Sequence, residues 1–94
     1  MREIFLNQKN AQEFAQISWE VTRDLKNDKF EWLVRQDKKA GRWFANIFPV
    51  GIAHEPNFPI YAGTPGEALR LSYLQYQAYL DKEEAEHLAK NPAT

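Results

Sequence analysis

The chain has 94 residues, of which 44% are hydrophobic and 14% aromatic, and its formal net charge is −1. This content excludes a disordered chain, and the length supports one hydrophobic core, so residues 1–94 are expected to form a single domain. Cysteine is absent, which excludes disulfide frameworks, thiol catalysis and cysteine-based zinc sites.

Membrane and secretory segments are not predicted. The unbroken apolar runs are far shorter than the ~20 residues that span a bilayer, and Met1 is followed directly by Arg2 and Glu3 instead of an apolar signal segment. We therefore expect a cytoplasmic protein that does not bind membranes. Positive charge lies mostly in the first half: residues 1–50 contain nine Lys and Arg against seven Asp and Glu.

The first 25 residues predict a short strand and a helix. Residues 3–6 read as a strand, and Asn10 with Glu13 forms a capping-box variant that begins a helix ending near Leu25. The apolar stripe of this helix consists of Ala11, Phe14, Ile17, Ser18, Val21 and Leu25. Trp19 points about 140° away from Phe14 at helical spacing, and is expected to lie on the opposite, polar side with Arg23.

The middle of the chain predicts a hairpin, a loop and a third short strand. Residues 30–36 and 42–48 are rich in strand formers, and the turn between them ends at Gly41, which tolerates a positive φ. Gly51, Pro56 and Pro59 predict a loop, after which residues 60–62 can add a short strand.

The last third of the chain predicts one long helix. Thr64 is a candidate N-cap, Pro65 fits the first helical position and Glu67 the third. The helix is expected to reach Asp81 and continue through His87, leaving residues 88–94 as a frayed tail. The predicted order is β-α-β-β-(β)-α. The expected fold class is α+β, with an antiparallel sheet of three to four strands and both helices packed on one face.

Catalytic and metal-binding patterns are weak. His54 lies in a loop, and His87 follows Glu84 by three residues on the last helix, without partners from other helices. Ser18 and Ser72 lie inside helices, where a hydroxyl usually bonds back to a carbonyl of the same helix. We therefore predict a protein that is not an enzyme and has no cofactor and no metal site.

A basic hairpin gives one alternative function. Its candidate nucleic-acid-binding residues are Arg35, Lys38, Lys39, Arg42 and Trp43. Cations there can neutralise phosphates while an aromatic ring stacks on a base, and the element order resembles that of double-stranded RNA-binding domains. Such domains normally begin their last helix with lysines, whereas this chain has Glu67 there. Basic residues at a hairpin tip also protect a sheet edge from wrong pairing.

The last helix is apolar on two sides. One side carries Leu69, Ser72, Tyr73, Tyr76, Tyr79 and Leu80, and a second stripe carries Leu71, Leu74, Ala78 and Ala85. The tyrosine side either packs beneath the first helix or faces a partner, which is another protein or a second copy of the chain. In the second case the partner-binding residues are Trp19, Arg23, Tyr73, Tyr76 and Tyr79.

The segments RWFANIFPV and YAGTPGEALRLSYLQYQAYLDKEE give the chain a family resemblance. Residues 30–84 resemble the HicB-type antitoxin core, in which a hairpin leads through a Thr-Pro turn into a helix. This chain departs from that pattern by its added N-terminal elements, its longer loop and its lack of a C-terminal DNA-binding segment. The chain also looks like small phage or mobile-element inhibitors such as anti-CRISPR proteins. The resemblance implies a small non-catalytic protein that binds and blocks a macromolecular partner.

Overall fold

The computed structural model describes residues 8–25, 29–51 and 56–90, and these confirm the α+β class. The elements are α1 (Gln8–Leu25), β1 (Phe30–Asp37), β2 (Arg42–Pro49), β3 (Ile60–Ala62) and α2 (Pro65–Lys90). Within the described residues the sheet has three antiparallel strands in the order β1-β2-β3. The strand predicted at residues 3–6 lies outside the described residues.

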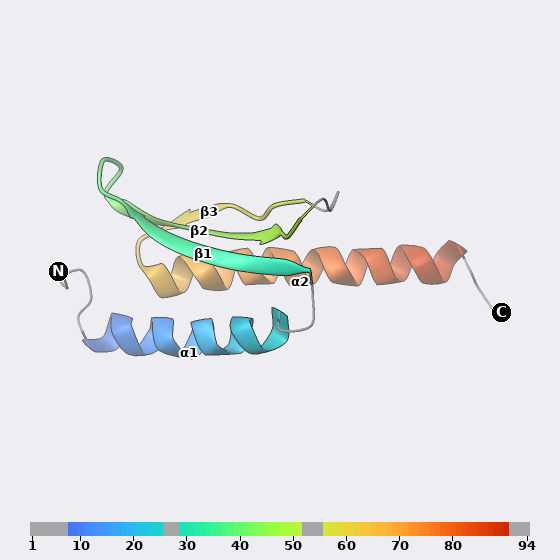
Figure 1. Ribbon diagram of the computed structural model, residues 1–94, viewed down its shortest axis with the longest axis horizontal. Helices are drawn as coiled ribbons and strands as arrows, with labels where there is room; N and C mark the ends of the chain where they lie inside the picture. The colour runs from blue at the N-terminus through green and yellow to red at the C-terminus, as the bar shows by residue number, and fades with distance from the viewer. Residues whose placement is uncertain (1–7, 26–28, 52–55, 91–94) are drawn as a thin grey trace.

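Both helices lie on the same side of the sheet, as predicted (Figure 1). α2 runs beneath the strands and α1 runs alongside α2, so no helix in the described part of the chain covers the other face of the sheet. The far end of α2 extends beyond the sheet, and the molecule measures 55 × 24 × 21 Å. The fold therefore leaves one open sheet face and one projecting helix.

Strand alternation decides which side chains point toward the helices. In β1 the inward side chains include Phe30, Trp32 and Val34, and in β2 the inward positions include Ala45 and Ile47, which are fully buried. The alternating residues of both strands point to the open face. The turn between them has Gly41 at φ 69°, and the carboxylate of Asp37 accepts a hydrogen bond from the Ala40 amide at 3.0 Å, as in a tight turn.

The core lies between the two helices and the inner face of the sheet. α1 contributes Ile17, Val21 and Leu25, in agreement with the apolar stripe predicted from the sequence. α2 contributes a set that includes Ala68, Leu69, Tyr73 and Tyr76.

The start of α2 matches its sequence signal, whereas the start of α1 does not. Thr64 Oγ1 accepts a hydrogen bond from the Glu67 amide at 3.1 Å, so Thr64 is the N-cap. α1 begins at Gln8, so the capping box predicted at Asn10 is wrong, because Asn10 already lies inside the helix. Glu13 instead lies against the start of α2, where its Oε1 is 3.4 Å from Thr64 Oγ1.

Gly66 permits this close approach of the two helices. A Cβ added at Gly66 would lie 2.9 Å from Glu13 Cγ, which is shorter than van der Waals contact. α2 then continues to Lys90, so residues 88–90, predicted as part of the tail, are helical.

Ser72 connects three parts of the fold. Its buried hydroxyl donates to the Phe58 carbonyl at 2.6 Å and accepts from the Ile47 amide at 3.0 Å. The prediction that this hydroxyl bonds back to its own helix is therefore wrong for Ser72. It holds for Ser18, whose Oγ donates to the Ala15 carbonyl at 3.1 Å.

Candidate binding surfaces

One row of side chains crosses all three strands on the open face of the sheet. In the strand register Arg35 pairs with Phe44, and Phe44 pairs with Tyr61. The rings of Phe44 and Tyr61 are 5.2 Å apart at an angle of 55°. Because directly opposed residues on one face are close neighbours, the register itself brings these three side chains together.

Two guanidinium groups lie on these rings. Arg35 Cζ is 5.1 Å from the centroid of Phe44, and Arg42 Cζ is 4.3 Å from the centroid of Tyr61. Both distances fall within the range of cation–π contacts, which at exposed sites contribute about 0.5–1 kcal/mol each. We call these four residues, Arg35, Arg42, Phe44 and Tyr61, the sheet-face cluster.

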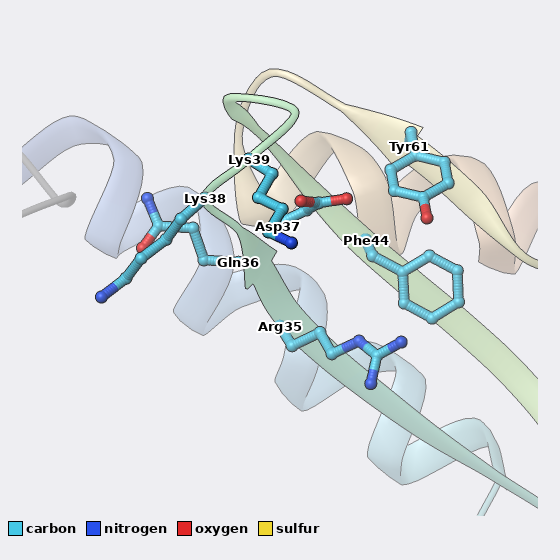
Figure 2. Close-up of a pocket in the computed structure, with 7 residues that line it drawn as sticks. All are labelled: Arg35, Gln36, Asp37, Lys38, Lys39, Phe44 and Tyr61. Carbon is cyan, nitrogen blue, oxygen red and sulfur yellow. The ribbon is translucent and has the colours of Figure 1, made fainter.

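A shallow hollow of about 450 Å³ adjoins the cluster at the hairpin end. Figure 2 shows Phe44 and Tyr61 side by side on one side of it and Asp37 and Lys39 on the other. In this view the ammonium group of Lys39 points toward the rings, whereas that of Lys38 points away from them. The hollow is therefore bordered by aromatic rings, cations and one carboxylate.

The structure assigns the predicted nucleic-acid-binding residues to different places. Arg35 and Arg42 belong to the sheet-face cluster, and Lys38 lies in the turn. Trp43 is a correction: it lies on the inner face of β2 and packs against the core, so it does not stand beside the basic side chains as a stacking platform. Strand alternation separates Trp43 from Arg42 by placing consecutive residues on opposite faces.

Phe44 and Tyr61 are the site residues that sequence reasoning missed. The signal was present, because the inward set Phe30, Trp32 and Val34 already placed Arg35 on the outer face. Counting across the turn then pairs Arg35 with Phe44. The position of Tyr61 depends on the pairing of β3, which a three-residue strand after a long loop does not reveal.

A second surface lies on the outer side of α1. Trp19 is 63% exposed, which agrees with its predicted position off the apolar stripe. Arg23 Cζ is 4.9 Å from its ring, and Arg23 Nε donates to Asp24 at 3.0 Å. An open hollow of about 480 Å³ is lined by Gln12, Ala15, Gln16 and Trp19. The pair Trp19 and Arg23 is thus available on the surface.

The tyrosines of α2 belong to the core side instead. Tyr76 is 2% exposed and lies 4.9 Å from Phe30, ring to ring. Tyr73 is also buried, and its hydroxyl donates to the carboxylate of Asp24 on α1. The assignment of Tyr73 and Tyr76 to a partner-binding surface is therefore corrected, because helix–helix and helix–sheet packing already covers them. Tyr79 is half-buried against Phe58, with ring centroids 5.6 Å apart.

The two histidines are the candidate catalytic and metal-binding residues of the sequence. His54 lies outside the described residues, and His87 lies on the exposed far part of α2. Residues 8–25, 29–51 and 56–90 contain no group of three or more His, Cys, Asp or Glu side chains that could hold a metal ion. Neither described helix has the combination of length and apolar character needed to cross a membrane.

Comparisons with known proteins gave no match among family models, curated proteins or solved structures. The resemblance of residues 30–84 to the HicB-type antitoxin core therefore stays a prediction from the sequence.

Proposed function

We propose that this protein is a non-catalytic binding protein that occludes part of a macromolecular partner, with the open face of the sheet as its docking surface. The observation that carries the proposal is the sheet-face cluster: two aromatic rings and two guanidinium groups, ordered by mutual contact on a face that no described helix covers. This keeps the class of function predicted from the sequence and moves its main surface from α2 to the sheet.

The composition and order of the cluster favour binding. Tyrosine and arginine are enriched among the residues that contribute most to protein–protein affinity. Contacts between Arg42 and Tyr61, and between Arg35 and Phe44, hold these side chains before a partner arrives. Ordering in the free protein lowers the entropy lost on association. A guanidinium that contacts a ring through its face also keeps its N–H edges for hydrogen bonds to carboxylates or carbonyl groups.

Ring geometry favours a protein partner over nucleic acid. Bases stack on aromatic side chains that present an open face. Here the two rings are tilted by 55° toward each other, and each already has a guanidinium within cation–π distance. Asp37 adds a carboxylate to the hollow beside them, which would repel phosphates.

Nucleic-acid binding remains the second candidate, because four cations occur along this hairpin. Arg35, Lys38 and Lys39 line the hollow, and Arg42 follows the turn. These side chains could neutralise phosphates without base stacking.

The two candidates differ in what a tagged bait should retain from a cell extract. We expect the wild-type protein to capture a protein partner that survives nuclease treatment, and a Tyr61→Ala/Arg42→Ala double variant to lose it. Trp19→Ala is the matched control, since it also removes an exposed aromatic ring but from α1. Loss of the partner with Trp19→Ala alone would place the docking surface on α1 instead.

The nucleic-acid candidate is tested directly by titrating labelled single-stranded and double-stranded oligonucleotides at several salt concentrations. Binding that weakens steeply with salt, and whose salt slope flattens in a Lys38→Ala/Lys39→Ala variant, would establish the second candidate. For a protein-binding role we expect no such binding, and a lower solubility of the lysine variant as its main effect.

A further inference from the structure

We infer that the second apolar stripe of α2, on the exposed side of the helix, is a self-association surface. It pairs with the same stripe of a second copy of the chain, with the two helices antiparallel. This surface differs from the sheet-face cluster, so the inference does not depend on the proposed function. Self-association gives the second apolar side of α2 a role.

The stripe follows a heptad pattern on the exposed side of the helix. Its positions alternate in steps of three and four, as in the seam of a coiled coil, and they are Leu71, Leu74, Ala78, Asp81, Ala85 and Leu88. All six are exposed, and the leucines are 38%, 51% and 60% exposed in chain order. Five of the six positions are apolar, and an exposed apolar stripe of this length is typical of an interaction surface.

The other described elements leave this seam accessible. The core-facing residues Leu69 and Tyr76 point to the opposite side of α2 at 100° per residue. The sheet and α1 both pack against that core-facing half. An approaching helix therefore meets the seam without displacing either element.

Charges beside the seam identify the occupant as a second copy. Arg70 and Glu84 flank the seam on the same side, each seven residues from Gln77, and all three are exposed. When two copies of α2 lie antiparallel with Gln77 opposite Gln77, Arg70 of each copy meets Glu84 of the other. In a two-fold symmetric dimer each contact occurs twice, so the Arg70–Glu84 contact forms once in each direction between the copies. Charges that flank the seam in this way determine which helices pair in coiled coils.

The seam residues agree with the antiparallel direction. In an antiparallel coiled coil the seam contacts are offset by two residues from the flanking contacts. When Gln77 meets Gln77 at the flank, Leu74 therefore lies opposite Ala78 of the second copy in the seam, so a large side chain meets a small one. A parallel dimer in register would instead place Asp81 opposite Asp81 and bring two like charges together. In the antiparallel pair Asp81 lies opposite Leu71, which limits affinity, as a polar seam residue does.

Sedimentation velocity of the full chain, from about 5 μM to about 1 mM, tests the inference. We expect a concentration-dependent monomer–dimer equilibrium. Leu74→Ala should weaken dimerisation by about tenfold. Leu80→Ala is the matched control, because Leu80 is another exposed leucine of α2, 40% exposed, but lies off the seam. A chain that stays monomeric up to the highest concentration overturns the inference, as does equal weakening by both substitutions.

Charge reversal tests the antiparallel direction. Arg70→Glu alone and Glu84→Arg alone should each weaken the dimer, and the double variant should restore it. Fourteen residues of helix separate the two positions by about 21 Å, so restoration requires contact between copies. Asp81→Leu should strengthen the dimer by about tenfold or more. Failure of both restoration and strengthening would overturn the antiparallel arrangement, while thermal melts of each variant confirm that it is folded.

Discussion

The hydroxyl group of Ser72 shows how one small side chain can hold a helix on a sheet. It satisfies a carbonyl of the segment before β3 and an amide of β2 at the same time, and it is fully buried. An apolar residue at this position would leave both backbone groups buried without this partner. Each such group costs about 1–3 kcal/mol when unsatisfied.

We therefore predict that Ser72→Ala lowers the free energy of unfolding by about 2–4 kcal/mol. Chemical denaturation followed by circular dichroism measures this difference. Ser18→Ala is the control, because Ser18 bonds only to the carbonyl of Ala15 in its own helix, on the surface; that change should cost less than about 0.5 kcal/mol. Equal effects of the two substitutions would show that the Ser72 hydrogen bonds do not support the fold.

Tyr76 and Trp19 provide a second contrast between buried and exposed residues. Tyr76 lies among Phe30 and Phe58, with ring centroids 4.9 and 5.9 Å away, so Tyr76→Ala removes a large part of the core. We predict a loss of about 3–5 kcal/mol in the free energy of unfolding. Trp19→Ala should cost less than about 1 kcal/mol, because Trp19 is on the surface.

The measurement is again a denaturation curve, with binding to a captured partner measured in parallel. Should Trp19→Ala unfold as easily as Tyr76→Ala, the outward position of Trp19 would be wrong.

At the scale of elements, the start of α2 depends on an N-cap residue that the sequence predicts. Thr64 Oγ1 accepts a hydrogen bond from the Glu67 amide at 3.1 Å, and Pro65 occupies the first helical position. Thr64→Ala should reduce stability by about 1 kcal/mol, whereas Thr64→Ser, which keeps the hydroxyl, should stay near wild type. Thermal melts of the three proteins check this order. Equal melting temperatures for Thr64→Ala and wild type would mean that the N-cap hydrogen bond contributes nothing to stability.

The elements themselves were largely predictable, because their signals are local. Periodicity located α1, α2 and the two long strands, and Thr64 fixed one helix start. The start of α1 was misplaced because an Asn-x-x-Glu pattern is compatible with a helix interior as well as with a cap. The end of α2 was placed at His87 instead of Lys90, because a sequence fixes a helix end only to within a few residues.

The candidate site was less predictable, because it depends on contacts between elements. Nothing local decides whether Tyr73 faces α1 or solvent; Asp24, 49 residues earlier, decides it. The same holds for the sheet-face cluster, whose members come from three strands. Trp43 was grouped with the basic residues of the hairpin because they are its neighbours in sequence, whereas strand alternation places it on the inner face, against the core.

At the scale of the whole molecule, the fold is longer than a compact domain of its size. Its Cα radius of gyration is 15.5 Å, compared with about 12 Å for a compact chain of this length. The excess comes from α2, whose far end extends beyond the sheet (Figure 1). Residues 81–88 are all exposed, so this part of the helix contributes surface instead of core.

The projecting end of α2 should therefore be dispensable for folding. We predict that a chain ending at Asp81 keeps the free energy of unfolding of the full chain to within about 1 kcal/mol, because the described side chains that it removes, at residues 82–88, are all exposed. The same truncation removes Ala85 and Leu88 from the seam and Glu84 beside it, so self-association should weaken by about tenfold or more. Denaturation curves and sedimentation velocity measure the two effects separately. A truncated chain that loses several kcal/mol of stability would mean that the far end of α2 packs against the body of the protein.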